Sequence, residues 1–203
     1  MLKGVAEAAP IDQISDYFTE MVRVCAAARV SDSDGRPMSL REGFEWFAEQ
    51  ARRAQASGNK MILIGNGGSA AIASHQAIEY LKNGGVRALA LNDGASLTAL
   101  ANDFGYANVF AEQLRMLGRR GDMLVAISSS GQSTNILKAV ETARARDMAV
   151  ATFSGFKPDN LLRGRGDMNF YVDSTQYGFV EIAHHALIQA ILDLNVIPKR
   201  PVE

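Results

Sequence analysis

The stretch KMILIGNGGSAAIASHQAIE, residues 60–79, joins an apolar run to a glycine-rich turn and a segment rich in small residues. A short, fully apolar run is typical of a strand that is covered on both faces of a sheet. Glycines allow positive φ and close approach to a ligand, and a helix that begins beyond them offers free amides to an anion. The stretch therefore predicts a strand, a turn and a helix, with the turn as a candidate binding site.

Further apolar runs follow and alternate with segments of helical spacing. The predicted strands are VRALAL (86–91), GDMLVAIS (121–128), MAVATFSG (148–155) and MNFYVD (168–173). The predicted helices cover residues 69–81, 96–117, 133–146 and 178–194. Strands that alternate with helices predict an α/β fold with a parallel sheet and right-handed crossovers.

Two amphipathic helices are expected ahead of this core, at about residues 11–30 and 40–56, with SDSDGRPMS (31–39) as the turn between them. Helices in this position bury their apolar faces against the core or a partner subunit. We therefore expect one domain over residues 1–203, with N-terminal helices in 1–57 and the α/β core in 58–203.

Composition narrows the class of protein. The 203 residues are 47% apolar and 21% charged, as in an ordinary globular protein, and the net charge of −1 gives no reason to expect binding to nucleic acid or a membrane. The single cysteine, Cys25, cannot form an internal disulfide, which fits a reducing compartment. No signal-peptide core and no span of about 18 apolar residues is present in the sequence, so a cytoplasmic protein is expected.

Two loops follow predicted strands, and in parallel sheets ligands bind at the carboxyl ends of strands. The first, GNGGSAA (65–71), is not a P-loop, because no Gly-Lys-Ser/Thr follows. It matches G-x-G-x-x-A loosely, but Asp93 lies too far along the chain for the usual ribose-binding acid. A nucleotide site and a plain tight turn without a ligand both stay open for this loop.

The second loop, ISSSGQSTN (127–135), favours a phosphate. Ser128, Ser129 and Ser130 leave a buried strand, Gly131 turns the chain, and Ser133 opens the next helix. Ser133 alone would be an ordinary N-cap, but a run of hydroxyls beside a helix amino terminus suits an anion. Serines without lysine suit the phosphate monoester of a small polyol.

Polar residues on two helices form the other candidate site. His75 and Glu79 are four apart and share a helix face. The apolar last helix carries Glu181, His184, His185 and Gln189, with Glu181 and His185 on one face. Such groups need partners when buried. They predict either a metal or acid/base site between the helices, or a hydrogen-bonded polar seam.

Taken together, the sequence resembles the SIS (sugar isomerase) domain family and, within it, the phosphoheptose isomerase group. The resemblance covers nearly the whole chain and is carried by GNGGSA, His-x-x-x-Glu, ANDFGYANVFAEQL, GD-x-L-x-x-IS-x-SG-x-S-x-N and VEIAHHALIQ. It implies a three-layer α/β/α sandwich with a five-stranded parallel sheet, assembled as a homotetramer with sites at subunit interfaces. It also implies isomerisation of sedoheptulose 7-phosphate to D-glycero-D-manno-heptose 7-phosphate through a cis-enediol.

The resemblance also assigns roles to residues. Those expected to bind substrate are Asn66, Gly67, Gly68, Ser69, Asn102, Asp103, Ser128, Ser129, Ser130, Ser133 and Glu181. The expected cofactor is zinc, with His75, Glu79, Glu181 and Gln189 as ligands and Glu79 also as the catalytic base.

The last helix departs from the family pattern, which has a glutamine and, eight residues later, a histidine. Here those positions hold Glu181 and Gln189, and glutamine cannot transfer protons as histidine does. His185 is the expected second acid/base group because it shares a face with Glu181, whereas His184 would need a rotated helix. Two alternatives follow: a non-catalytic SIS module that binds a phosphosugar or a protein, and an isomerase of another sugar phosphate.

Overall fold

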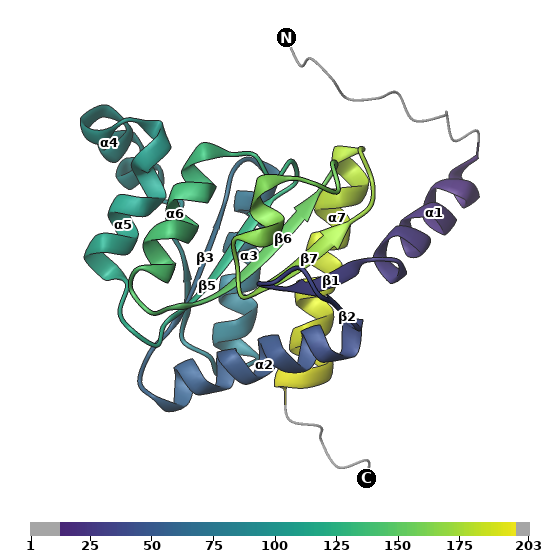
Figure 1. Ribbon diagram of the computed structural model, residues 1–203, viewed down its shortest axis with the longest axis horizontal. Coiled ribbons are helices and arrows are strands. Elements are labelled where there is room, and N and C mark those ends of the chain that lie inside the picture. Colours follow the sequence, from purple (N-terminus) through teal and green to yellow (C-terminus); the bar gives the residue numbers. More distant parts are fainter. Residues whose placement is uncertain (1–12, 198–203) are drawn as a thin grey trace.

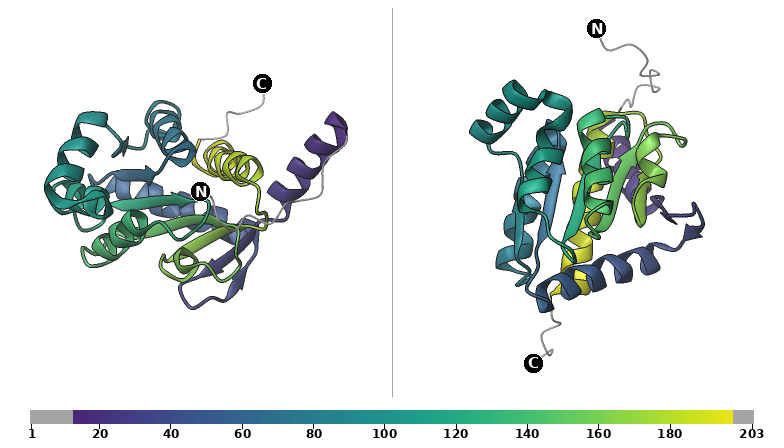
Figure 2. Two further views of the ribbon diagram at one scale, coloured as in Figure 1. Left: turned by 90° about the horizontal axis from the view of Figure 1, so that it is seen from above. Right: turned by 60° about the vertical axis from the view of Figure 1, so that its left-hand side comes forward.

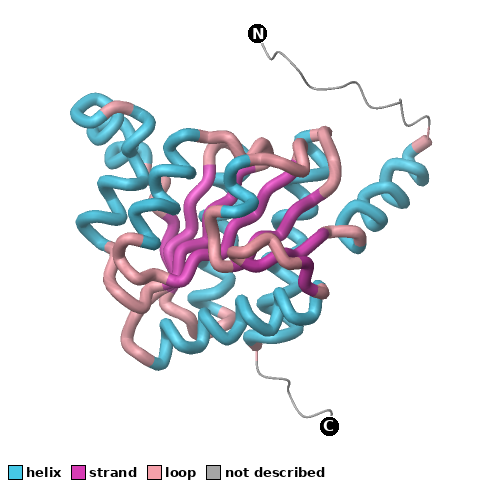
Figure 3. Tube along the Cα trace, viewed as in Figure 1, coloured by secondary structure: helices cyan, strands magenta, loops and turns pink. Residues whose placement is uncertain are grey.

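The computed structural model of the chain describes residues 13–197. One sheet contains the described strands in the order β2-β1-β7-β6-β5-β3-β4. They are β1 (Arg29–Asp32), β2 (Pro37–Met38), β3 (Met61–Gly65), β4 (Ala88–Ala90), β5 (Met123–Ser128), β6 (Ala149–Gly155) and β7 (Met168–Val172). The strands lie in the middle of the molecule and helices flank them (Figure 3).

The helices alternate with the parallel strands as the sequence predicts. They are α1 (Ile14–Ala26), α2 (Leu40–Ala56), α3 (Gly68–Lys82), α4 (Gly94–Phe104), α5 (Val109–Leu117), α6 (Thr134–Arg144) and α7 (Tyr177–Ile191). Short turns of 3-10 helix, η1 (Tyr106–Asn108) and η2 (Leu161–Gly164), and a π-helical turn, η3 (Leu192–Val196), complete the chain. None of the helices within residues 13–197 is long and apolar enough to cross a membrane.

Strands β4, β3, β5, β6 and β7 pair in parallel, which confirms the predicted parallel sheet of a SIS-type α/β fold. The sheet has two further strands that the sequence analysis missed. Strand β1 pairs antiparallel with β7, with Val30 opposite Phe170, and β2 pairs antiparallel with β1. The prediction of a helix to residue 30 was therefore wrong at its end: α1 stops at Ala26, and residues 11 and 12 lie outside the described part.

The hairpin forms where only a turn was predicted, because Val30 and Ser31 are buried against the sheet and Gly35, with φ of 77°, makes the tight connection. The predicted helix 96–117 is interrupted as well. Gly105 has φ of 78° and separates α4 from η1 and α5. The second error comes from reading apolar spacing across Gly105, whereas the first comes from the long-range pairing of β1 with β7.

Two apolar clusters form the core, one on each face of the sheet. Helices α2, α3 and α7 cover one face, where Phe47 and Tyr80 pack near Phe153 and Phe170 of the sheet. Helices α5 and α6 cover the opposite face. Figure 2 shows the sheet between these layers. Helix α1 projects from the side of the molecule and contacts α7 (Figure 1).

The strand order places the candidate loops together. From β3 the chain crosses to β4 on one side, whereas β5 lies on the other side of β3. The strand order therefore reverses between β3 and β5, and at such a point the loops after the two strands diverge and leave a crevice. The glycine loop follows β3 and the serine loop follows β5, so the fold brings both to this crevice.

Candidate active site

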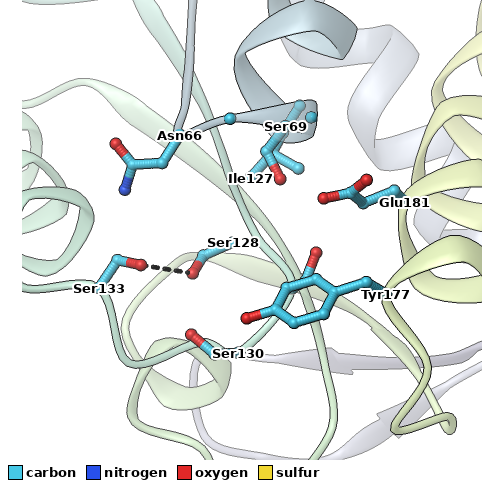
Figure 4. A pocket seen from close by; sticks show the side chains of 11 residues that line it. Asn66, Ser69, Ile127, Ser128, Ser130, Ser133, Tyr177 and Glu181 are labelled. Atoms are coloured by element: carbon cyan, nitrogen blue, oxygen red, sulfur yellow. Dashed lines mark hydrogen bonds between the residues drawn. The ribbon is translucent and has the colours of Figure 1, made fainter. Parts of the chain in front are cut away.

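A pocket of about 240 Å³ opens at this crevice (Figure 4). The predicted substrate-binding residues that line it are Asn66, Gly67, Gly68, Ser69, Ser128, Ser129, Ser130, Ser133 and Glu181. Ile127 and Tyr177 complete the lining. Hydroxyl groups and one carboxylate surround the cavity, and among the described residues no cationic side chain lines it. An anion in this pocket would be held by neutral donors.

The glycine loop approaches α7 closely. Gly67 has φ of 54° and precedes α3, a conformation that glycine adopts without strain. A Cβ atom on Gly68 would overlap the Glu181 carboxylate, so this side chain lies directly against the start of α3. The close approach at Gly68 therefore places the Glu181 carboxylate at the amino terminus of α3, on the wall of the pocket.

The serine loop presents free hydroxyls. Ser128 Oγ donates to Ser133 Oγ at 3.3 Å, and the Ser133 side chain makes no capping hydrogen bond to α6. Ser129 Oγ is buried and has no hydrogen-bond partner among the described residues. Gly131, with φ of 62°, turns the loop tightly, and a Cβ atom there would overlap Asn160 Oδ1. An unpaired buried Ser129 hydroxyl, beside a Ser133 hydroxyl that does not cap α6, fits a site that a ligand completes.

An amide pair joins the two loops. Asn66 and Asn135 exchange two hydrogen bonds of 2.9 Å, and the Tyr106 hydroxyl donates to Asn66 Oδ1 at 3.0 Å. The sequence analysis did not single out Asn135 or Tyr106, although both lie within quoted motifs. The signals for them were a polar residue at the second position of a helix, Asn135, and an aromatic residue directly after Gly105, Tyr106.

Asn102 and Asp103 do not line the pocket. Both are exposed on α4, and Asn102 Nδ2 donates to Asp103 Oδ1 at 2.9 Å. Within their motif it is Tyr106 that reaches the glycine loop. A substrate contact by Asn102 or Asp103 stays a prediction.

Helices α3 and α7 bring two histidines together. The rings of His75 and His185 lie 4.8 Å apart between centres, edge to face. Partial burial lowers the pKa of His185 below its ordinary value, and His75 lowers it further by charge repulsion. Glu79, one turn after His75, accepts a short hydrogen bond from Asn83. Gln76 and Tyr80, which follow His75 and Glu79 directly in the sequence, are fully buried and mark the inward face of α3. His75 and Glu79 are more exposed and lie on its outward face.

His184 lies on the other side of α7. It is fully buried, its Nε2 lies 3.0 Å from the Ser154 carbonyl oxygen, and its Nδ1 has no partner among the described residues. Burial lowers its pKa to about 4, so it is neutral at pH 7. The helix is not rotated toward His184, and His185 is the histidine that faces α3.

Gln189 is held in a hydrogen-bonded chain. Its Oε1 accepts from Gln76 Nε2 at 3.0 Å, and its Nε2 donates to Asp193 Oδ1 at 2.9 Å. Glu181 contacts Gly68, one end of α3, whereas Gln189 contacts Gln76, two turns farther on. Glu181 and Gln189 therefore lie against different levels of α3 in this structure.

The predicted zinc ligands therefore do not meet within one chain. Over the described residues 13–197, no three His, Cys, Asp or Glu side chains gather as a metal-binding group. His75 and Glu79 remain a ligand pair of suitable chemistry on an exposed helix face. Zinc binding by His75, Glu79, Glu181 and Gln189 stays a prediction.

Comparison with known proteins agrees with the fold. A model of the SIS domain matches residues 38–155. The chain is 33% identical over 201 residues to the phosphoheptose isomerase of Colwellia psychrerythraea, covering 93% of this chain and 98% of that protein. It is 34% identical over 192 residues to the phosphoheptose isomerase of Shewanella frigidimarina, covering 90% of this chain and 93% of that protein.

Solved structures give the same result. Phosphoheptose isomerase GmhA from Neisseria gonorrhoeae superposes with a TM-score of 0.76 at 33% identity, covering 89% of this chain and 96% of that one. A phosphoheptose isomerase from Francisella tularensis gives a TM-score of 0.77 at 27% identity, covering 92% and 97%.

Proposed function

Because this chain belongs to the SIS domain family and to its phosphoheptose isomerase group, we propose that it is an aldose–ketose isomerase acting on sedoheptulose 7-phosphate. The product is D-glycero-D-manno-heptose 7-phosphate, formed through a cis-enediol. The observation that carries the proposal is the pocket at the strand-order reversal, in which the serine hydroxyls and the glycine loop meet. Isomerisation needs a held phosphate and a base near the carbonyl end of the sugar.

The serine loop holds the phosphate in this proposal. Ser129 Oγ is buried without a partner in the described chain, and the Ser133 hydroxyl is not used as a helix cap. Hydroxyl donors and the open amino terminus of α6 suit a phosphate monoester. The glycine loop and Glu181 then face the polyol, where a carboxylate accepts hydrogen bonds from sugar hydroxyls.

Glu79 and His185 carry the proton transfers. Glu79 removes the proton next to the carbonyl and returns it to the neighbouring carbon. His185 has a lowered pKa and is therefore largely neutral at pH 7, so its ring can accept and return a hydroxyl proton. His75 lies against His185 and orients its ring.

A second copy of the chain completes the site. Ile78 and Leu81, beside Glu79 on α3, are exposed large apolar residues, as is Ile182 of α7. Apolar side chains next to a proposed base favour burial of this face in an assembly. We propose the homotetramer of the family, with sites at its interfaces. Assembly would also supply the ligands that His75 and Glu79 need to hold zinc, and a bound zinc ion would stabilise the enediolate oxygen.

Two broader expectations complete the proposal. We propose a single domain over residues 1–203, because β1 extends the sheet of the core and Phe47 of α2 is fully buried in it. We also propose a cytoplasmic location, on the basis of the single cysteine, Cys25, which fits a reducing compartment.

The test is turnover. Purified protein is incubated with sedoheptulose 7-phosphate, with and without zinc, and aldose formation is followed by NMR. The proposal predicts aldose with the natural sequence and none with Glu79→Gln. If neither the natural protein nor Gln189→His forms aldose, the chain is not this isomerase.

Binding and turnover measurements on the same proteins distinguish two other functions. The hydrogen bonds that occupy Gln189 favour a non-catalytic module that binds a phosphosugar or a protein partner. Such a module would bind the sugar phosphate without turnover. An isomerase of another sugar phosphate would leave sedoheptulose 7-phosphate unchanged and convert a shorter or epimeric substrate.

A further inference from the structure

We propose that Tyr177 is a phosphate-binding residue, positioned by Phe156, whose phenolic hydroxyl joins the serine hydroxyls in holding the ligand's phosphate. The proposal rests on the proposed function, because it takes the pocket as a phosphosugar site. No motif quoted from the sequence includes Tyr177.

The position of Tyr177 is the first observation. It is the first residue of α7, lines the pocket and is 44% exposed. Its hydroxyl points across the cavity toward Ser128 and Ser130 (Figure 4). Of the side chains drawn in that view, only Ser128 and Ser133 share a hydrogen bond, so the rest of the pocket leaves the phenol group free. Its donor hydrogen is available to a ligand.

The support behind the ring is the second observation. Phe156 packs edge-on against Tyr177, with 4.7 Å between ring centres and 79° between ring planes. Phe156 has φ of 60°, a left-handed conformation that a bulky residue rarely adopts. Such a conformation persists only where the surroundings hold it, and it occurs often beside binding sites.

The backbone of Phe156 is held at both ends. Its N–H donates to the Ser174 carbonyl at 3.0 Å, and its carbonyl accepts from the Tyr171 hydroxyl at 2.8 Å. Burial, followed by the nearby Asp173 carboxylate, raises the pKa of Tyr171 to about 12, which keeps this hydroxyl protonated as a donor. The support for Tyr177 is therefore rigid and does not change across the physiological pH range.

The described lining of the pocket lacks positive charge, so a neutral donor such as the Tyr177 hydroxyl matters for holding a phosphate. Within residues 13–197, no Lys, Arg or His lines the cavity, and the Glu181 carboxylate stands one helical turn from Tyr177. A phosphate bound here gains no ion pair and must rely on hydroxyl and amide donors. A hydrogen bond from a neutral donor to a charged acceptor is stronger than one between neutral groups, so losing one donor weakens binding by about 10- to 100-fold.

The alternative is that Tyr177 only packs against Phe156 at the start of α7. Calorimetric titration of the full chain with inorganic phosphate, sedoheptulose 7-phosphate and unphosphorylated sedoheptulose separates the two roles. Tyr177→Phe keeps the ring and removes only the hydroxyl. Tyr17→Phe is the matched control, because Tyr17 of α1 packs against Phe179 outside the pocket. Phe156→Leu tests the positioning role.

We expect Tyr177→Phe to weaken both phosphate ligands about 10- to 100-fold, with Tyr17→Phe unchanged and Phe156→Leu between them. Any binding of unphosphorylated sedoheptulose should be the same in all variants. Equal phosphate binding by Tyr177→Phe and the natural protein would overturn the proposal, as would the absence of any phosphate-ligand binding. Tyr177-dependent binding without isomerisation would leave this inference standing and remove the isomerase function. Thermal unfolding of each variant checks that it is folded.

Discussion

His75 and His185 face each other across α3 and α7, with 4.8 Å between their ring centres. They come from helices more than a hundred residues apart in the sequence. Glu181 and Gln189 lie at different levels of α7, against Gly68 and Gln76, so among the polar α7 side chains it is His185 that meets His75.

The proton-transfer roles predict a graded loss of turnover. Glu79→Gln should abolish exchange of the substrate proton with solvent, because an amide cannot accept it. His185→Gln should lower kcat by about 10²- to 10⁴-fold, the usual contribution of a positioned acid/base group. Deuterium incorporation from heavy water, read by NMR, measures both. Gln189→Ala is the control, and a larger loss in this variant than in His185→Gln would contradict the assignment.

The histidine environments predict an ordered titration. The chain has three histidines, so three imidazole signals are resolvable by NMR. His184 should stay neutral until about pH 4, and His185 should titrate below its ordinary value of 6.5. His75→Asn should raise the pKa of His185, because the neighbouring positive charge is lost. An unchanged His185 titration in that variant would mean that burial alone sets its pKa.

His184 also predicts how stability depends on pH. Its pKa is 6.5 when unfolded and about 4 when folded, so between these values the unfolded chain binds more protons. Stability from this residue is complete above pH 6.5 and is lost as the pH falls toward 4. From pH 7.5 to 5 the loss is about 2 kcal/mol. Urea unfolding of the natural protein and of His184→Gln measures it; identical pH slopes would refute this prediction.

Alanine substitutions at Gly131 of the serine loop and at Gly35 of the β1–β2 turn distinguish the cost of backbone strain from the cost of steric overlap. Gly131→Ala places a Cβ on Asn160 at a φ of 62°, whereas Gly35→Ala has a φ of 77° and no atom within 4 Å. Gly35→Ala should cost about 1 kcal/mol of unfolding free energy, and Gly131→Ala about 2 to 4 kcal/mol. Only Gly131→Ala should also weaken phosphate binding. Chemical denaturation measures the unfolding free energies, and calorimetry measures phosphate binding. Equal losses of unfolding free energy in the two variants would show that Asn160 moves aside without cost.

The exposed face of α1 predicts an assembly contact. Ile14, Phe18 and Val22 are four residues apart and are 81%, 62% and 68% exposed. Burial of this stripe by another copy would stabilise an oligomer. Phe18→Glu should therefore lower the mass measured by light scattering, whereas Arg41→Glu, an exposed charge change on α2, should not. A Phe18→Glu protein of unchanged mass would place the interface elsewhere.

Local sequence predicted the parallel sheet and the pocket loops because both depend on short-range patterns. Apolar runs mark β3, β5, β6 and β7, and turn chemistry marks the loops that follow β3 and β5. The pattern failed at the β1–β2 hairpin and at Gly105. Strand β1 exists because Val30 pairs opposite Phe170, a contact across 140 residues that no local periodicity contains.

The sequence by itself determined that a loop of serines and a glycine turn would meet at one sheet edge, because parallel strands place their carboxyl ends together. Only the tertiary structure decided which α7 side chains face them. Helix periodicity gives relative angles but not the rotation of α7 against α3. That rotation buries His184, pairs His185 with His75, ties Gln189 to Gln76, and directs Tyr177 into the pocket.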